Sequence, residues 1–552
     1  MKEKVALAAA IAVALFLRVY DIEVMPAWDW DEGVNLNIAS NLAEGRAQQF
    51  ALKYVWIPHP PLYFIAALPA MELLGKTIAS LRLLSIAYSI ATLILVYLIG
   101  KKLDGGLTGV TAAFFYAIYP AAVFWNRMGF AHNQLMLLAT TALYLLINKR
   151  AGNRIYFASA AVFLCFITEY SGAAFIAAVL AHTLIYRREE FNKAALITAT
   201  LVLAYTAVMV YLYGGWFLQD LQFNFGRVNA VAFALAAAIA ALFLLRPQKL
   251  KQLLGWFHMK ADHIGLNVFL FYLPLTLLAV LIPPTTETML DPISYFWVAG
   301  AIGLLFIADE EKRDTMWLFY LSYLAMLGVY NRADHMAVPL YPILSIGAAV
   351  FLLKLASSRE RITAAIRGAG ARKAAAAISL ALIFYPAAVV TLQDISGFAS
   401  GSNFRATPLS EMQKLNEFIN ANTVAGDIVL TQSYLSQGLE CRTTILLHAI
   451  AYDGQGIAYY PPLNPERFAY NTSIANLRYA VLPEHAVEAL NQSGYAEAAE
   501  ELSRWRVVYE TQPEGDAGVP VVYSFINEIK GVEYDNAAPT LQVLENPRKP
   551  TG

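Results

Sequence analysis

The sequence predicts a polytopic α-helical membrane protein with about 13 transmembrane helices and a C-terminal extracytoplasmic α/β domain. Its 552 residues are 58% hydrophobic, and the mean hydropathy is +0.48. Only 15% of the residues are charged, whereas roughly a quarter would be charged in a soluble protein. Apolar runs of helical length recur as far as about residue 393, where the composition changes.

The apolar runs define the predicted spans. Their ranges are 5–20, 80–100, 107–125, 133–148, 155–168, 171–186, 194–213, 230–245, 266–282, 293–308, 315–330, 336–354 and 374–393. The first run lacks a convincing small-residue cleavage site, so we expect an uncleaved helix. The segment 62–74 is too short to cross a bilayer and is expected to lie at the interface or to dip into the membrane. Trp216, Arg246-Pro247 and His258 interrupt the apolar pattern over 214–265, which leaves the sidedness of that stretch open.

The basic residues predict the orientation. If the N-terminus is inside, alternate connections carry most of the Lys and Arg, as the positive-inside rule requires. These connections are Lys101-Lys102, Lys149–Arg154, Arg187–Lys193, Arg246–Lys251, Lys312-Arg313 and Arg359–Lys373. The first outer loop is then 21–79. Thirteen spans place the chain end on the extracytoplasmic side of the plasma membrane.

The composition of the chain after about residue 393 predicts a separate domain. We expect residues 1–393 to form a multi-span membrane catalytic domain and 394–552 an extracytoplasmic α/β domain. From residue 401 the chain has 18 Asp and Glu against 10 Lys and Arg. Its pattern predicts a helix and several strands. The helix is Leu409–Asn420, and the strands are Asp427–Thr431, Leu477–Leu482, Trp505–Glu510 and Pro520–Phe525.

The first outer loop contains the strongest candidate site. Asp29, Asp31 and Glu32 lie in the run Trp28–Gly33, and acids at a membrane edge are candidate functional residues because their burial is costly. Val34, Ile38 and Leu42 then predict a short helix that stops at Gly45. A helix N-terminus favours an ionised carboxylate, so Asp31 is a candidate general base. The alternative, that Asp31 only caps the helix, explains neither Asp29 nor the tryptophans.

His59-Pro60-Pro61-Leu62 is the second element of that loop. The prolines keep His59 extended, and Pro61 can open a helix that runs to Leu74. An imidazole and a helix N-terminus on one surface suit a phosphate group. An ordinary proline turn between two helices is the alternative.

The order of these motifs resembles the GT-C glycosyltransferases of the protein-mannosyltransferase and aminoarabinose-transferase type, glycosyltransferase families 39 and 83. In that superfamily an Asp-Glu pair in the first outer loop precedes an HPPL segment, as Asp31-Glu32 precedes His59–Leu62 here. Shorter matches extend the resemblance over most of the chain. They are Arg82, Gly105-Gly106, Arg127 with Asn133–Leu135, Pro339–Pro342 and the tail segment Phe418–Leu430.

The chain also departs from the family pattern. His132 stands where the second motif has an acid, and Glu169 stands where an outer turn often has a lysine. Before the late proline motif, where the family often has a basic or tyrosyl residue, the chain has Arg332, Asp334 and His335. These departures concern the donor, the metal and the phosphate contact rather than the architecture.

The resemblance implies a transferase that moves a sugar, mannose being the commonest in the family, from a polyprenyl or dolichyl phosphate to an acceptor hydroxyl with inversion. Asp31 is then the base, with Asp29 and Glu32 as further catalytic candidates. The residues expected to meet the phosphate and substrate are His59, Arg82, Arg127, His132, Glu169 and Arg332. Snorkelling at the interface is the alternative for the arginines.

A divalent cation is a further expectation, with candidate ligands on the outer turns: Asp29, Asp31, His59, His132 and Glu169. No Cys/His metal spacing and no nucleotide-binding glycine loop occurs in the sequence, and no cofactor is certain. The expected partners are the lipid-phosphate sugar, a protein, lipid or glycan acceptor, and membrane lipids, with no nucleic acid.

Two other classes of protein are weighed against the transferase. A transporter or flippase of a lipid-linked substrate would carry its ionisable residues near the midplane on broken helices, whereas these acids fall on outer turns. A receptor or assembly subunit would need only one span and no acidic loop. The sequence does not identify the sugar, the acceptor, the lipid or the oligomeric state.

Overall fold

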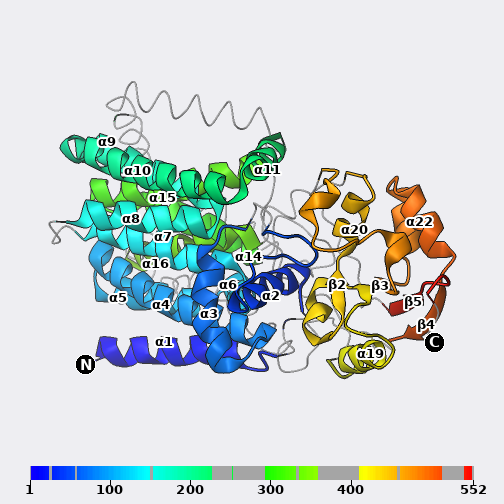
Figure 1. Ribbon diagram of the computed structural model, residues 1–552. Helices are drawn as coiled ribbons and strands as arrows, with labels where there is room; N and C mark the ends of the chain where they lie inside the picture. The colour runs from blue at the N-terminus through cyan, green and yellow to red at the C-terminus, as the bar shows by residue number, and fades with distance from the viewer. Residues whose placement is uncertain are drawn as a thin grey trace.

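A computed structural model describes residues 2–23, 26, 28–55, 59–148, 153–226, 252, 292–330, 335–357, 409–456, 461–511 and 540–549. The chain forms a helical bundle and, beside it, a smaller part built on a mixed β-sheet (Figure 1). We call these the membrane half and the C-terminal half. The predicted boundary near residue 393 falls outside the described residues.

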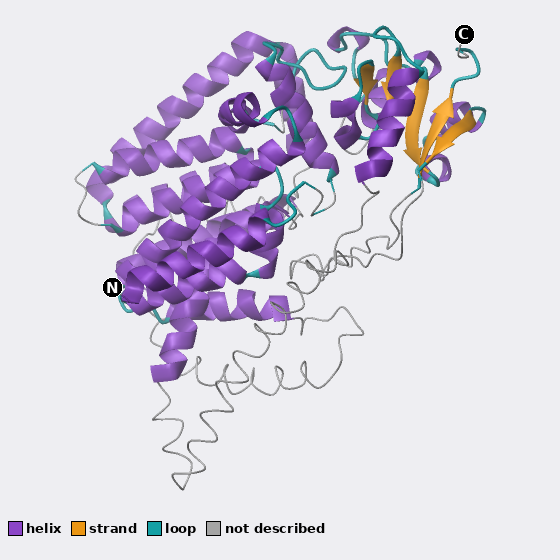
Figure 2. Cartoon of the chain, turned by 90° about the horizontal axis from the view of Figure 1, so that it is seen from below, coloured by secondary structure: helices purple, strands orange, loops and turns teal. Residues whose placement is uncertain are grey.

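The membrane half is built from α-helices that run alongside one another (Figures 1 and 2). They are α1 (Lys2–Val19), α4 (Ile78–Asp104), α5 (Gly106–Ile118), α6 (Pro120–Asn126), α7 (Ala131–Ile147), α8 (Arg154–Thr168), α9 (Ala173–Tyr186), α10 (Arg188–Tyr213), α11 (Gly215–Gly226), α14 (Pro292–Leu305), α15 (Glu310–Tyr330) and α16 (Tyr341–Ser357). Short 3-10 turns precede two of them, η1 (Tyr170–Gly172) before α9 and η2 (His335–Leu340) before α16.

These helices follow the predicted spans with local differences. The predicted span 107–125 is two helices, because Pro120 interrupts the backbone hydrogen bonding and opens α6. Among the described residues, three helical stretches are long and apolar enough to cross a membrane: Ile78–Asp104, Arg188–Tyr213 and His335–Lys354. The predicted spans 230–245, 266–282 and 374–393 lie outside the described residues. The count of 13 stays a prediction.

Glycines allow the closest helix crossings of the bundle. A Cβ atom on Gly303 of α14 would lie 1.7 Å from the carbonyl oxygen of Gly347 on α16, and one on Gly347 would lie 2.0 Å from that of Gly300. On α5, a Cβ atom on Gly109 would lie 2.6 Å from the carbonyl oxygen of Tyr97 on α4. Small residues of this kind let membrane helices pack backbone to backbone.

The loop after α1 contains two short helices, α2 (Trp30–Ala43) and α3 (Leu62–Leu74). The predicted helix through Val34, Ile38 and Leu42 is confirmed, and the chain turns at Gly45 with φ of 76°. Leu62–Leu74 is a short helix that ends at Leu74, as the sequence predicted. Val34, Ile38, Tyr63, Phe64 and Leu81 belong to one apolar cluster, so α2 and α3 pack on the start of α4.

The C-terminal half contains a five-stranded sheet in the order β2-β1-β3-β5-β4 (Figure 2). Its strands are β1 (Ile428–Leu430), β2 (Arg442–Thr444), β3 (Tyr479–Pro483), β4 (Arg506–Glu510) and β5 (Leu541–Glu545). Strand β1 pairs in parallel with β2 and β3, whereas β5 pairs antiparallel with β3 and β4. The predicted strand Pro520–Phe525 lies outside the described residues.

Helices cover both faces of this sheet. Helix α19 (Leu409–Ala421) packs on the face formed by Val429, Tyr479, Val481 and Val543. The opposite face, which includes Leu430, Leu482 and Leu544, is covered by three helices. These are α20 (Leu446–Tyr452), α21 (Ala486–Gln492) and α22 (Ala496–Ser503). The alternation along each strand gives every helix an apolar surface to bury.

The two halves meet around a buried arginine. Arg467, at the end of the 3-10 turn η4 (Pro465–Arg467), donates from Nη1 to Asp220 Oδ1 of α11 at 2.7 Å and from Nη2 to Gln219 Oε1 at 2.7 Å. Nη1 also donates to the hydroxyl of Tyr54 in the first loop. The Arg467 and Asp220 side chains are 3% and 1% exposed. The Arg467 side chain therefore links the C-terminal half to α11 through an ion pair and to the first loop through a hydrogen bond.

Candidate active site

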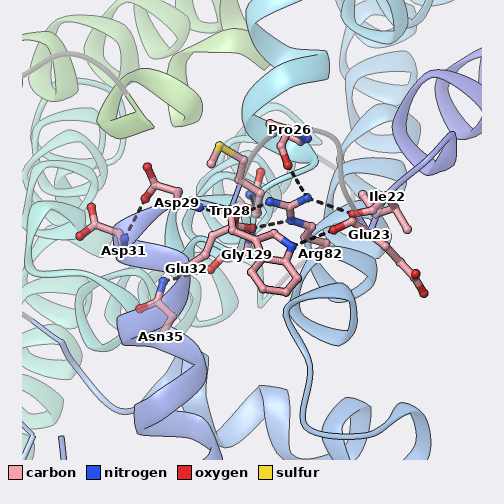
Figure 3. Close-up of polar contacts among 12 residues, drawn as sticks. Ile22, Glu23, Pro26, Trp28, Asp29, Asp31, Glu32, Asn35, Arg82 and Gly129 are labelled. Atoms are coloured by element: carbon pink, nitrogen blue, oxygen red, sulfur yellow. Dashed lines mark hydrogen bonds and ion pairs between the residues drawn. The ribbon is translucent and has the colours of Figure 1, made fainter. Parts of the chain in front are cut away.

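Glu32 is the fixed member of the acidic cluster. Arg82 of α4 donates from Nε to Glu32 Oε1 at 2.8 Å and from Nη2 to Glu32 Oε2 at 2.5 Å (Figure 3). The backbone N–H of Gly129 also donates to Glu32 Oε1, at 2.7 Å. Both charged side chains are fully buried. Paired charges and satisfied oxygens make Glu32 a structural residue that fixes α2 on α4.

Asp29 is the N-cap of α2. Its Oδ1 accepts the backbone N–H of Asp31 at 2.8 Å, and the Glu32 side chain accepts the backbone N–H of Asp29. Burial first, and then the neighbouring charges of Asp31 and Glu32, raise the pKa of the Asp29 carboxyl to about 8. The cap is thus Asp29, not Asp31, so the alternative that Asp31 is a mere cap is wrong.

Asp31 is the available carboxylate. It lies in the first turn of α2, half-buried, and among the described residues its side chain has neither a hydrogen-bond partner nor an ion-pair partner. Figure 3 shows Asp29 and Asp31 on the side of α2 away from Arg82. An unengaged carboxylate at a helix N-terminus can accept a proton from a bound hydroxyl.

His59 and Glu169 lie within electrostatic range of Asp31. Burial lowers the pKa of His59 to about 4, against the opposing effect of the Asp31 charge. Burial raises the pKa of Glu169 to about 8, and the Asp31 charge acts in the same direction. Both groups are therefore neutral at pH 7, and a neutral Glu169 does not repel an anion as an ionised carboxylate would.

His132 and His335 form an aromatic group close to these residues. Their rings are 4.8 Å apart, and the His335 ring is also 4.8 Å from the Phe130 ring. His132 is 5% exposed, and its Nε2 has no hydrogen-bond partner among the described residues. His59 lies within electrostatic range of His132. The structure thus brings together predicted site residues from α2, the HPPL segment, α7 and the turn after α8.

Two predicted phosphate-binding arginines do not belong to this group. The Nη1 of Arg82 donates to the carbonyl oxygens of Ile22 and Pro26, and its other donors bind Glu32. Arg127 is fully buried and donates to the carbonyl oxygens of Leu17 and Tyr20, at the end of α1. Buried, engaged guanidinium groups hold the chain itself, which argues against the phosphate contact expected from the sequence. Arg332 lies outside the described residues.

The metal expectation has limited support from this arrangement. Within the described ranges, no three His, Cys, Asp or Glu side chains are grouped closely enough to hold a metal ion. Asp29, one of the five candidate ligands, is occupied as a cap. Of the remaining four candidates, Asp31 is within electrostatic range of His59 and Glu169, and His59 is within range of His132. Among the described residues they do not form a ligand set.

Sequence reasoning missed the residues that fix α2 from outside its own loop. The carbonyl oxygen of Gly129 accepts from Asn35 Nδ2 at 2.9 Å, while its N–H binds Glu32. From the C-terminal half, Ser433 and Tyr434 lie against Gly33. A glycine inside a helical pattern signals close backbone approach, so Gly33 is the feature that could have indicated this contact.

Residues 58–216 match the family model described as dolichyl-phosphate-mannose-protein mannosyltransferase. The fold resembles the apo oligosaccharyltransferase of Archaeoglobus fulgidus with a TM-score of 0.57 and 12% identity, over 94% of this chain and 75% of that chain. It also resembles apo ArnT of Cupriavidus metallidurans with a TM-score of 0.51 and 14% identity, over 98% and 97%. These two structures have the fold of the GT-C membrane glycosyltransferases, and this chain shares that fold.

Other solved GT-C structures contain lipid phosphates. ArnT of Cupriavidus metallidurans bound to undecaprenyl phosphate has a TM-score of 0.51 with this chain, at 12% identity over 89% of this chain and 94% of that chain. A search of curated proteins found no match. At these identities the structural likeness describes the GT-C fold alone, and the chemistry must be argued from this chain's own residues.

Proposed function

We propose that this GT-C protein transfers a sugar from a polyprenyl or dolichyl phosphate to an acceptor hydroxyl at the extracytoplasmic face, with Asp31 as general base. The supporting observation is the difference between the three acids of the first loop. Glu32 is paired with Arg82, Asp29 caps α2, and Asp31 has no partner among the described residues. The family match, and the undecaprenyl phosphate bound to the similar ArnT, support a lipid-phosphate donor.

Each residue of the site has a separate part in the proposed reaction. Asp31 removes the proton of the acceptor hydroxyl as its oxygen attacks the anomeric carbon, and the bond from that carbon to the phosphate oxygen breaks with inversion. The lipid phosphate leaves with the bonding electrons. His59 and His132 offer neutral imidazoles that can donate an N–H to a phosphate oxygen, and the neutral Glu169 adds no opposing charge. Mannose is the sugar we would test first.

The test is transfer in membranes from a panel of radiolabelled polyprenyl-phosphate sugars. We expect label to reach an acceptor in the wild type, and Asp31→Asn to reduce the rate by about 10² to 10⁴, the usual contribution of a general base. Glu72→Gln on the exposed side of α3 is the matched acid-to-amide control and should retain the rate. Linkage-specific glycosidase digestion of the product reports inversion.

Two results would contradict the proposal. Transfer that survives in Asp31→Asn would remove Asp31 from the role of base. A wild type that moves the intact lipid-linked sugar across the bilayer without transferring the sugar would support the transporter alternative instead.

A further inference from the structure

The C-terminal half contacts the helix that carries the acids. Its 3-10 turn η3 (Ser433–Gly438) packs on α2, and Figure 1 shows α2 between the bundle and the yellow segment of the C-terminal half. Ser433 Oγ donates a hydrogen bond to the carbonyl oxygen of Trp30, in the first turn of α2. A residue more than 400 positions later in the chain thus binds the turn that contains Asp31.

Gly33 makes this contact possible. A Cβ atom at Gly33 would lie 2.2 Å from the backbone nitrogen of Tyr434, 2.3 Å from the carbonyl carbon of Ser433 and 2.6 Å from Cα of Tyr434. All three are backbone atoms of η3, so a side chain could be accommodated only if the turn and the helix moved apart. The glycine directly after Asp31-Glu32 is therefore required for the contact between α2 and η3.

Tyr434 lies beside the acids. Its ring, like that of Trp28, packs in both the apolar cluster of the first loop and the cluster beneath the sheet. Burial and then the Asp29 charge raise the pKa of the Tyr434 hydroxyl to about 12, so the side chain is neutral and lies within electrostatic range of Asp29.

The position of Asp31 depends on where the first turn of α2 sits. Arg82 and Gly129 hold Glu32 from the membrane half, and η3 holds Trp30 and Gly33 from the C-terminal half. A displacement of about 1 Å at a reacting group can cost about a hundredfold in rate. Contacts from only one side would leave the turn free to tilt away from the acceptor.

We propose that Tyr434 is a positioning residue for the carboxylate pair Asp29 and Asp31, and that Gly33 is the contact point through which the C-terminal half reaches this pair. The inference rests on the proposed transfer reaction. Under this proposal, turn η3 helps to position the acids of the site. The turn lies about 400 residues after these acids in the sequence.

The test compares Tyr434→Ala and Gly33→Ala in full-length protein, with a mannosyl polyprenyl phosphate as donor. Each variant should reduce kcat by about tenfold to a hundredfold while the donor KM stays within about twofold. Because Gly33→Ala already separates η3 from α2, adding Tyr434→Ala should cause little further loss. The matched controls are Gly328→Ala, where a Cβ atom meets nothing within 4 Å, and Tyr495→Ala in the C-terminal half; both should keep kcat.

The pH profile separates positioning from mere packing. The charged and titratable groups facing Asp29 are Asp31 and Glu32 on α2, Arg82 on α4 and Tyr434 on η3. In Tyr434→Ala, water reaches Asp29 and lowers its pKa from about 8 toward its ordinary value of 3.8. The part of the kcat profile that Asp29 contributes near pH 8 should therefore move to lower pH, while the part from Glu169, whose pKa is also about 8, stays in place. A change confined to stability would leave the shape of the profile unchanged.

The possible results are distinct. If the wild type transfers sugar and Tyr434→Ala matches it in kcat and pH profile, the inference is wrong and the proposed function stands. Additive losses in the double variant would likewise overturn the link between Gly33 and Tyr434. If Gly33→Ala does not fold, Tyr434→Ala and Ser433→Ala, which loses the bond to Trp30, decide the question. A wild type inactive with every donor refutes the proposed function itself.

Discussion

At the residue scale, three carboxylates at the start of α2 have three different environments. Asp29 accepts a backbone N–H, Glu32 is buried against Arg82, and Asp31 is half-buried with no partner among the described residues. A carboxylate that already accepts several hydrogen bonds is held in place and is a poor proton acceptor, whereas a free one can react. The carboxylate of Glu32 therefore has a structural role, and the carboxylate of Asp31, one residue earlier, has a proposed chemical role.

The first prediction separates these roles with two isosteric changes. Glu32→Gln leaves the buried Arg82 without its counter-charge, so we expect a loss of about 3 kcal/mol in the free energy of unfolding. Asp31→Asn removes no ion pair within the described residues and should keep the melting temperature while transfer is lost. Thermal unfolding in detergent and transfer in membranes measure the two effects. Equal stability losses in both variants would contradict the assignment.

The second prediction concerns Glu169. Its pKa of about 8 means that the carboxyl gains a charge as the pH rises through that value, beside Asp31. The new charge should repel the anionic donor, so the donor KM should rise above about pH 8. Glu169→Gln stays neutral and should remove most of this rise, and the remainder would come from Asp29, which titrates in the same range. A KM that rises equally in the variant would show that Glu169 is remote from the donor.

The sequence indicated Asp31 as the candidate base, but it could not show which groups engage the arginines. A sequence motif shows that a charged residue is present. It does not show which residue the fold places beside that charge. Arg82 meets Glu32 across 50 residues, and Arg127 binds the end of α1 more than 100 residues earlier. Both were expected at a phosphate because the family resemblance implied it, but both neutralise or anchor the protein's own chain.

At the element scale, apolar patterning predicted most helices, because burial in a bundle or bilayer needs only composition and length. It missed helix breaks that depend on one residue, such as the end of α5 at Ile118, two residues before Pro120. In the C-terminal half it predicted β1, β3 and β4 and missed β2 and β5. β2 is a three-residue edge strand, and β5 reaches its partners only after a long intervening segment.

The third prediction concerns the crossing of α14 and α16. Replacing Gly303 or Gly347 with Ala places a Cβ atom against the opposing backbone, at 1.7 Å and 2.0 Å from a carbonyl oxygen. The helices must separate and lose dispersion contacts, so we expect a destabilisation of about 1–3 kcal/mol. Gly328→Ala on α15 meets open space and should be neutral or stabilising. Melting temperatures that are equal for all three variants would show that the crossing is not tightly packed.

At the scale of the whole molecule, the contacts between the two halves include η3 on α2, and Arg467 on α11 and the first loop. Neither contact could be predicted from sequence. Asp220 and Arg467 lie 247 residues apart, and the sequence around each one indicates only an ordinary surface charge. Both contacts reach the first outer loop, so that loop is held from the C-terminal half at its beginning and at its middle.

The fourth prediction tests the second contact. Burial raises the pKa of Asp220 to about 6, although Arg467 acts to lower it. A carboxyl whose pKa is higher folded than unfolded contributes stability that is present below about pH 4 and lost as the pH rises through about 6. Arg467→Gln removes the lowering effect, so the buried Asp220 charge should cost about 3 kcal/mol at pH 7.5 and much less at pH 5, where the carboxyl is protonated.

The pH dependence of this loss distinguishes the ion pair from lost packing. Arg467 also lies over the rings of Tyr54 and Trp216, and loss of those contacts would lower the melting temperature equally at both pH values. Adding Asp220→Asn should restore most of the loss at pH 7.5, since no buried charge then remains. Arg504→Gln, an exposed arginine paired with Glu500, is the control and should change stability by less than about 1 kcal/mol. A loss independent of pH would assign the junction to aromatic packing rather than to charge.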